Sequence, residues 1–75
     1  MTDDFQEQLK QARRTLILNA AIDVIAAQGF QRTTIKQIAK KAGVADGTIY
    51  NYFKNKGAIM EGIVARMTAT EMQDM

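Results

Sequence analysis

The chain has 75 residues, which is enough for one small domain built around a single hydrophobic core. It contains no cysteine and no histidine, so disulfide bonds and metal sites with thiolate or imidazole ligands are excluded. The hydrophobic content is 47%, proline is absent and the formal net charge is only +2. This composition predicts a helical protein that is stabilised by apolar packing and needs no cofactor.

The charges are unevenly distributed along the chain. Residues 30–60 have a local net charge of +5, from six basic residues and one acidic residue: Arg32, Lys36, Lys40, Lys41, Lys54 and Lys56 against Asp46. Most of the other acidic residues lie near the two ends of the chain. A basic centre between acidic flanks is typical of a surface that faces phosphates, although a solvated lysine face would give the same pattern.

No segment has the pattern of a signal peptide or a membrane span. The first residues are polar and acidic, and the longest apolar stretch, 16–27, is interrupted by Asn19 and Asp23. The sequence therefore predicts a cytoplasmic protein with no membrane partner.

The first predicted helix spans about residues 3–28. Apolar residues at helical spacing form its expected core-facing stripe, which is Ile17, Ala21, Val24 and Ile25, extended upstream by Leu9 and Phe5. Gly29 is expected to end this helix, because glycine adopts the left-handed conformation found at helix ends.

The second predicted helix spans about residues 34–42. Its apolar stripe consists of Ile35, Ile38, Ala39 and Ala42. Either Thr33 or Thr34 could cap its amino end, and Thr34 with Gln37 forms a T-x-x-Q capping box. Gly43 is expected to end it.

A third helix is predicted over about residues 46–53, and a fourth over 58–75 after a cap at Asn55. The fourth carries an apolar series, Ile59, Met60, Ile63, Val64 and Met67, and has no stop signal. We therefore expect residues 1–57 to form one unit, and 58–75 to lead towards a larger part of the protein.

The turn of residues 43–45 has the length and the glycine of a helix-turn-helix. Ala39 is small enough for two helices to approach closely, and Gly43 adopts a positive φ at little cost. Val44 and Ile49 are expected to fill the space between the helices. The predicted fold class is all-α, a three-helix helix-turn-helix (homeodomain-like) bundle with the start of a fourth, connecting helix.

At about 100° per residue, the third helix turns Ile49 and Phe53 towards the core. Its other faces carry small or polar side chains with a tyrosine on each flank: Gly47, Thr48, Tyr50, Asn51 and Tyr52. A slim polar face of this kind suits the DNA major groove, which is about 12 Å wide.

This pattern predicts base contacts from Thr48, a base or phosphate contact from Asn51, and phosphate contacts from the tyrosines, from Lys56 and from the amino end of the second helix near Thr34. The full predicted set of DNA-binding residues is Thr34, Lys36, Asp46, Gly47, Thr48, Tyr50, Asn51, Tyr52 and Lys56. Several of them also have a plainer explanation: tyrosines are often core residues, Thr34 can act as a helix cap, and the lysines of the second helix could be only solvated. Asp46 would repel a phosphate and fits better as a cap or as compensation of the helix dipole.

A set of short motifs resembles the signature of the TetR (tetracycline repressor) family over about residues 14–64. The motifs are Gln28-Gly29-Phe30, Thr33-Thr34, Ile38-Ala39, Ala42-Gly43-Val44, Gly47-Thr48-Ile49-Tyr50, Tyr52-Phe53 and Lys54-Asn55-Lys56. The resemblance implies the DNA-binding head of a repressor that reads a palindromic operator in double-stranded DNA. It also implies a homodimer and a small-molecule effector, both served by a further domain outside this sequence. The DNA contacts that it implies are Thr34, Gly47, Thr48, Tyr50, Tyr52 and Lys56.

The sequence departs from the family pattern at two positions within the resemblance. Ala45 stands where the family usually has a serine cap, so Asp46 is expected to take over the capping of the third helix. Gly57 stands where an acidic residue is common, which weakens the first turn of the fourth helix by up to about 1 kcal/mol.

Two other functions stay open at this point. A small helical protein-interaction module could use the tyrosines and the methionine-bearing last helix to dock a partner, and recombinases or sigma-like factors also contain helix-turn-helix units. An enzyme is not indicated, because the sequence lacks histidine, cysteine and a glycine-rich phosphate loop.

Overall fold

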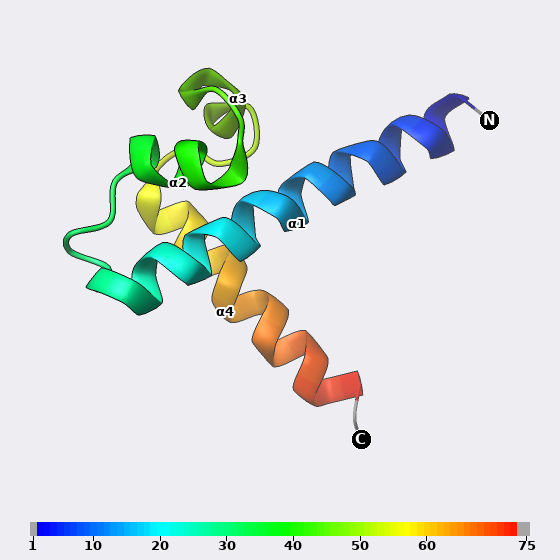
Figure 1. Cartoon of the computed structure of the whole chain (residues 1–75). Helices are drawn as coiled ribbons and strands as arrows, with labels where there is room; N and C mark the ends of the chain where they lie inside the picture. Colours follow the sequence, from blue (N-terminus) through cyan, green and yellow to red (C-terminus); the bar gives the residue numbers. More distant parts are fainter. Residues whose placement is uncertain (1, 74–75) are drawn as a thin grey trace.

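The computed structural model describes residues 2–73, and this range contains four helices and no strand. The helices are α1 (Thr2–Gln28), α2 (Ile35–Ala42), α3 (Asp46–Tyr50) and α4 (Lys56–Gln73). Figure 1 shows that α1 and α4 cross, that α2 and α3 lie together on one side of the crossing, and that one end of each long helix projects from the body. The expected all-α helix-turn-helix fold is confirmed. The predicted last two residues of the fourth helix, 74 and 75, lie outside the described residues.

The core lies where the four helices meet. Each helix contributes one isoleucine with an exposed fraction of 0%: Ile17, Ile38, Ile49 and Ile59. Burying a side chain of this size stabilises a fold by about 1.5–3 kcal/mol. These four positions lie on the stripes expected from the sequence, so the central part of the packing follows from helical periodicity.

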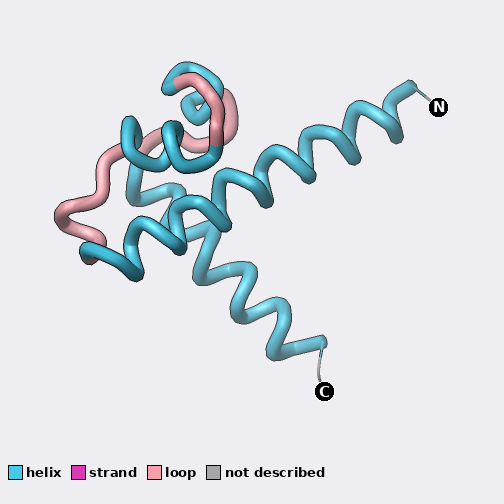
Figure 2. Tube along the Cα trace, viewed as in Figure 1, coloured by secondary structure: helices cyan, strands magenta, loops and turns pink. Residues whose placement is uncertain are grey.

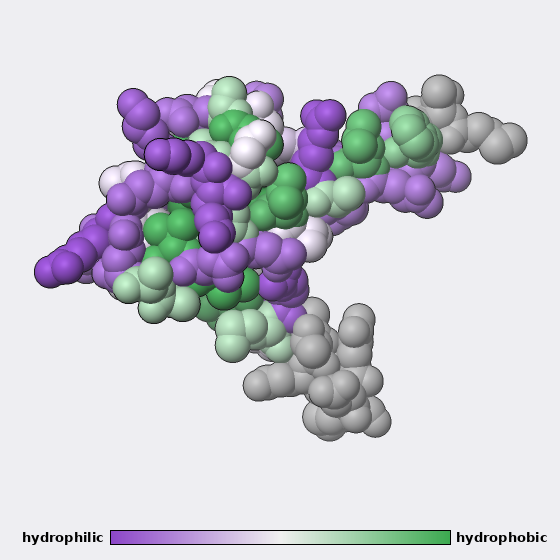
Figure 3. Space-filling view, in the orientation of Figure 1, coloured by the Kyte–Doolittle hydropathy of each residue, from purple (hydrophilic) through white to green (hydrophobic). Residues whose placement is uncertain are grey.

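The amino-terminal part of α1 does not belong to this core. Phe5 and Leu9 are 63% and 38% exposed, so the expectation that they extend the core stripe is wrong. At about 100° per residue, both lie roughly 80–120° around the helix from Ile17. All side chains in residues 4–13 are exposed, because this part of α1 projects beyond the packed core. Figure 3 shows apolar atoms on the surface of this projecting segment.

The loop between α1 and α2 decides which threonine is the cap. The Thr34 hydroxyl accepts a hydrogen bond from the Gln37 N–H (3.1 Å), and the Gln37 side-chain oxygen accepts one from the Thr34 N–H (3.0 Å). Thr33 is instead buried and donates its hydroxyl hydrogen to the Gly29 carbonyl (2.8 Å). Gly29 itself has a φ of +88°, as expected for the residue that ends α1. Figure 2 shows this loop as the longest connection that leaves the body of the protein.

The turn between α2 and α3 is built around Gly43, whose φ is +78°. The Gly43 N–H donates to the Lys40 carbonyl (3.3 Å), and the Val44 N–H donates to the Ala39 carbonyl (2.9 Å). These are the two hydrogen bonds of a Schellman motif, which satisfies the last carbonyls of α2. Ala39 is buried, as expected for the place where α2 and α3 pack together.

The third helix is shorter than predicted, because α3 ends at Tyr50 and not at residue 53. The N–H groups of Asn51 and Tyr52 donate to carbonyls three residues earlier, at Thr48 (3.1 Å) and Ile49 (2.9 Å). This tighter turn satisfies carbonyls that have no partner at a helix end. The Phe53 N–H still donates to the Ile49 carbonyl (2.9 Å), so the chain curves inward and Phe53 is buried.

The caps of α3 and α4 differ in kind. Ala45 occupies the cap position of α3 and has no side-chain hydrogen bond to the helix, so the expectation that Asp46 takes over capping is wrong. Asp46 is already the first helical residue, where its carboxylate interacts favourably with the helix dipole but does not occupy the cap position. At α4 the Asn55 side-chain oxygen accepts a hydrogen bond from the Ala58 N–H (2.8 Å), which confirms Asn55 as a cap. The helix begins directly after it, two residues earlier than predicted.

None of the described helices is both long enough and apolar enough to cross a membrane.

Candidate nucleic-acid interface

The outward side of α3 is slim and polar. Gly47 and Asn51 are exposed, Thr48 is half-buried, and Ile49 on the opposite side is fully buried. A Cβ added at Gly47 would meet no other atom within 4 Å, so the surface is open at this point. The predicted division of this segment into a core side and an outward side is confirmed.

The two tyrosines beside this face are not equivalent. Tyr50 is 55% exposed, whereas Tyr52 is half-buried and packs against the hydrophobic core. The wheel projection places them symmetrically, but the helix ends between them and the turn carries Tyr52 inward. Tyr50 is therefore the more exposed of the two residues, and Tyr52 is held in place by its packing against the core.

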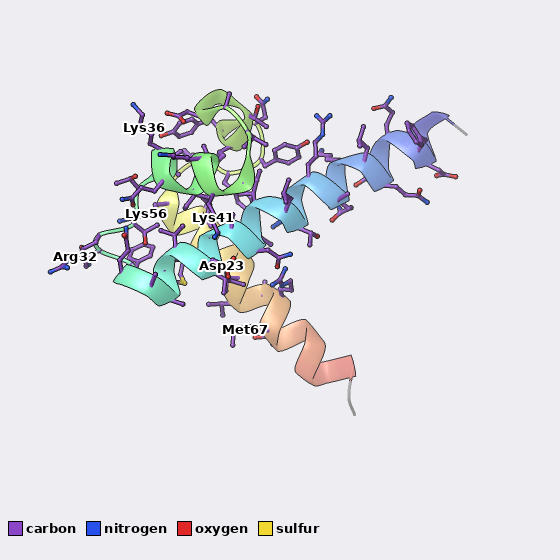
Figure 4. The ribbon with its side chains drawn as sticks, viewed as in Figure 1. Asp23, Arg32, Lys36, Lys41, Lys56 and Met67 are labelled. Atoms are coloured by element: carbon purple, nitrogen blue, oxygen red, sulfur yellow. The ribbon has the colours of Figure 1, made fainter. Side chains whose placement is uncertain are left out.

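The amino end of α2 places two further predicted contacts at the surface. Thr34 is exposed and accepts the capping hydrogen bond, so its hydroxyl hydrogen can still be donated outward. Lys36 is exposed and projects from α2 on the side of the molecule where α3 lies (Figure 4). Asp46 is exposed at the first turn of α3 and places one negative charge on the same surface.

Lys56 has a structural role that the sequence did not indicate. Its ammonium nitrogen donates to the carbonyl of Phe30 (2.9 Å) and lies 3.5 Å from that of Gln31. The same nitrogen lies 4.4 Å from the centre of the Phe30 ring, as a cation–π contact. Lys56 is half-buried and joins the first turn of α4 to the loop that follows α1 (Figure 4). An ammonium has three donors, so a phosphate contact through the remaining hydrogen stays compatible with this geometry.

Not all basic residues of the segment 30–60 lie near α3. Lys40 and Lys41 line a hollow between α1 and α2 together with Asp23 of α1, and no residue of α3 belongs to that hollow. Figure 4 places Lys41 beside Asp23 and apart from Lys36. The net charge of residues 30–60 is therefore an imperfect measure of the charge around α3.

A second hollow, beside the carboxyl end of α3, brings in residues that the sequence analysis did not connect with DNA. Asn51 and Tyr52 line it together with Gln6, Lys10 and Arg13 from the projecting part of α1. The sequence indicates a basic face on the first helix, because the spacing of Lys10 and Arg13 places both on one side of it. The sequence did not show that this face passes α3.

The amino-acid sequence matches a known family over well over half of its length. Residues 17–63 match the sequence model of the family described as bacterial regulatory proteins, tetR family. The fatty acid metabolism regulator protein of Bacillus subtilis (strain 168) is 51% identical over 51 residues, which cover 68% of this chain and 26% of that relative. The HTH-type transcriptional regulator UidR of Escherichia coli (strain K12) is 36% identical over 64 residues, which cover 85% of this chain and 32% of that relative.

A solved structure is similar in fold as well as in sequence. The fatty acid degradation regulator FadR from Bacillus halodurans matches with a TM-score of 0.80 and 37% identity, over 83% of this chain and 33% of that chain. The matched part of the chain thus spans only about a quarter to a third of the length of these three regulators.

Proposed function

The chain belongs to the TetR family of bacterial regulatory proteins. We propose that it is the DNA-binding head of a transcriptional repressor. In this proposal α3 enters the major groove of an operator half-site. The observation that carries the proposal is the outward side of α3, where Gly47 lets the backbone approach the DNA and polar side chains surround it.

The exposed side chains suggest a division of roles. Thr48 offers a methyl group to thymine and a hydroxyl to a base edge, and Asn51 offers an amide. Tyr50, Thr34 and Lys36 donate to phosphates, which sets the position of the head without reading sequence. Asp46 would face bases and not phosphates, because a carboxylate can accept a hydrogen bond from cytosine but repels a phosphate.

The proposal extends to the parent protein, which would act as a homodimer in the bacterial cytoplasm. Two heads about 34 Å apart would contact successive major grooves of a palindromic operator. Residues 58–75 would connect the head to a domain that binds a small-molecule effector. Ile59 and Ile63 of α4 are buried in the core of the head, so a displacement of α4 by the effector would move the head with it and change the spacing.

A salt titration separates this function from the docking of a partner protein. We expect the 75-residue chain to bind duplex DNA weakly, with a Kd of roughly 10⁻⁴–10⁻⁶ M at physiological salt. The logarithm of the affinity should fall steeply with the logarithm of the salt concentration, because each phosphate contact adds about 0.9 to the slope. Fluorescence anisotropy with a labelled duplex measures both quantities. Binding that is absent at low salt, or insensitive to salt, would favour the interaction module.

Selection of bound sequences from a random duplex pool tests the assignment of α3. Thr48→Ala should change which bases are preferred, whereas Tyr50→Phe should weaken binding to all sequences alike. Thr15→Ala is the matched control, because Thr15 is exposed on α1 and does not line the hollow beside α3. An unchanged preference in Thr48→Ala would remove Thr48 from the base-reading set.

A further inference from the structure

We propose that the projecting amino-terminal part of α1 is a second DNA contact of this chain, in which Lys10 and Arg13 bind backbone phosphates beside the groove that α3 enters. This inference rests on the proposed DNA binding by α3. It adds a surface that lies outside the helix-turn-helix and outside the matched family region, residues 17–63.

The position of this surface is given by the hollow beside the carboxyl end of α3. Lys10 and Arg13 line it from α1, and Asn51 and Tyr52 line it from the segment that follows Tyr50. When α3 lies in a major groove, its neighbouring side chains face the sugar–phosphate backbone along that groove. Figure 1 shows the amino-terminal half of α1 extending past α3, as a backbone contact at this place requires.

The chemistry of the helix face changes along α1. At about 100° per residue, Gln6, Lys10 and Arg13 fall within an arc of roughly 60° that is centred on the direction of Ile17. Downstream, this face is buried against the other helices at Ile17 and Ala21. Upstream it is polar and basic, and its side chains are exposed. A face that continued the protein core would be apolar, and the change to basic residues makes this part of the face complementary to an anionic partner.

The two cations are available for such a partner. Within the described part of the chain, no hydrogen bond or ion pair holds the Lys10 ammonium or the Arg13 guanidinium. Glu7 is the acidic residue that lines the same hollow, and its carboxylate accepts a hydrogen bond from the Gln11 side chain (3.2 Å). The hollow therefore has an excess of positive charge beside α3.

The experiment measures the salt dependence of duplex binding by the 75-residue chain and its variants. Lys10→Gln and Arg13→Gln should each weaken binding about tenfold near 0.1 M salt and reduce the salt slope by about 0.9, with the double variant reducing it by about 1.8. The loss should be the same for all duplex sequences, since phosphates carry no base information. Lys41→Gln, which removes the same charge from the hollow between α1 and α2, is the matched control and should keep the slope.

Glu7→Gln provides a test with the opposite sign. Removing the acidic side chain from the hollow should strengthen DNA binding and leave the thermal unfolding midpoint unchanged, and a gain in affinity cannot result from misfolding. A salt slope that is unchanged in the Lys10→Gln, Arg13→Gln double variant would overturn this inference while leaving the proposed function intact. Failure of the unmodified chain to bind any duplex at low salt would overturn both.

Discussion

At the scale of single residues, several proposed DNA contacts also hold the fold together. Thr34 caps α2 through its hydroxyl, and Lys56 joins α4 to the carbonyl of Phe30. A substitution at either position would change folding stability and DNA binding at once. Stability must therefore be measured beside affinity before either residue is counted as a contact.

Thr34 allows the two roles to be separated. Thr34→Ala should lower the free energy of unfolding by about 1 kcal/mol, because the N–H of Gln37 loses its acceptor. In a domain of this size this corresponds to a fall in Tm of about 4–8 °C. Thr34→Asp keeps a cap acceptor but has no hydrogen to donate and carries a negative charge, so it should retain most of the stability but weaken DNA binding. Thermal unfolding followed by circular dichroism measures the stability, and fluorescence anisotropy measures the DNA affinity. Equal stability of Thr34→Ala and the unmodified chain would contradict the capping role.

At the scale of elements, α2 and α3 differ in how their ends are satisfied. α2 has a reciprocal capping box at one end and the Gly43 hydrogen bonds at the other. α3 has five residues and no side-chain cap, and helices of this length are not stable alone. The orientation of α3 thus depends on Ile49 and Phe53 in the core. Among the described helices, the one proposed to read DNA therefore depends most on tertiary contacts for its stability.

Ala45→Ser should repair the weak start of α3. The backbone at Ala45 has φ −77° and ψ 154°, the extended conformation that a cap residue requires. A serine there should add a hydrogen bond to the first turn and raise the free energy of unfolding by about 1 kcal/mol. Ala12→Ser, at an exposed position within α1, is the control and should lower stability slightly. Thermal unfolding of both variants decides the question, and a lower Tm for Ala45→Ser would show that the extended backbone is not a cap site.

At the scale of the whole molecule, the crossing of α1 and α4 also contacts the segment that follows α3. Gly62 of α4 is buried there, and a Cβ at this position would lie 3.2 Å from the Leu18 side chain and 3.3 Å from the Phe53 ring. The Arg14 guanidinium carbon lies 4.9 Å from the centre of the same ring. Phe53 follows the DNA-facing segment directly, so the position of α4 and the position of α3 are mechanically linked through this contact.

Gly62→Leu tests this link. The larger side chain has no space at the crossing, and overpacking of this kind should lower the free energy of unfolding by about 1–3 kcal/mol. Because α4 must move away from Phe53, DNA affinity should also fall under conditions where the variant is folded. Ala65→Leu adds the same side chain at an exposed position of α4 and should change neither quantity by much. Full stability of Gly62→Leu would mean that the two helices separate without cost.

Features that depend on neighbouring residues could be predicted from the amino-acid sequence. The cap at Asn55, positive φ angles at Gly29 and Gly43, and buried isoleucines at helical spacing are set within one or two turns of the chain. The sequence left Thr33 and Thr34 open as the cap of α2, and the structure assigns the cap to Thr34. The outward side of α3 also follows from local periodicity, through Ile49 on the opposite side.

Features that depend on where distant segments meet could not be predicted from the sequence, because they follow from the packing of the helices. Phe5 and Leu9 are apolar but exposed, because this part of α1 projects beyond the core formed by the four helices. Lys56 binds Phe30 from 26 positions away, and Lys10 and Arg13 border Asn51 only because α1 passes α3. Helical periodicity specifies which face of a helix is apolar. The packing of the other helices determines how much of the length of that face they cover.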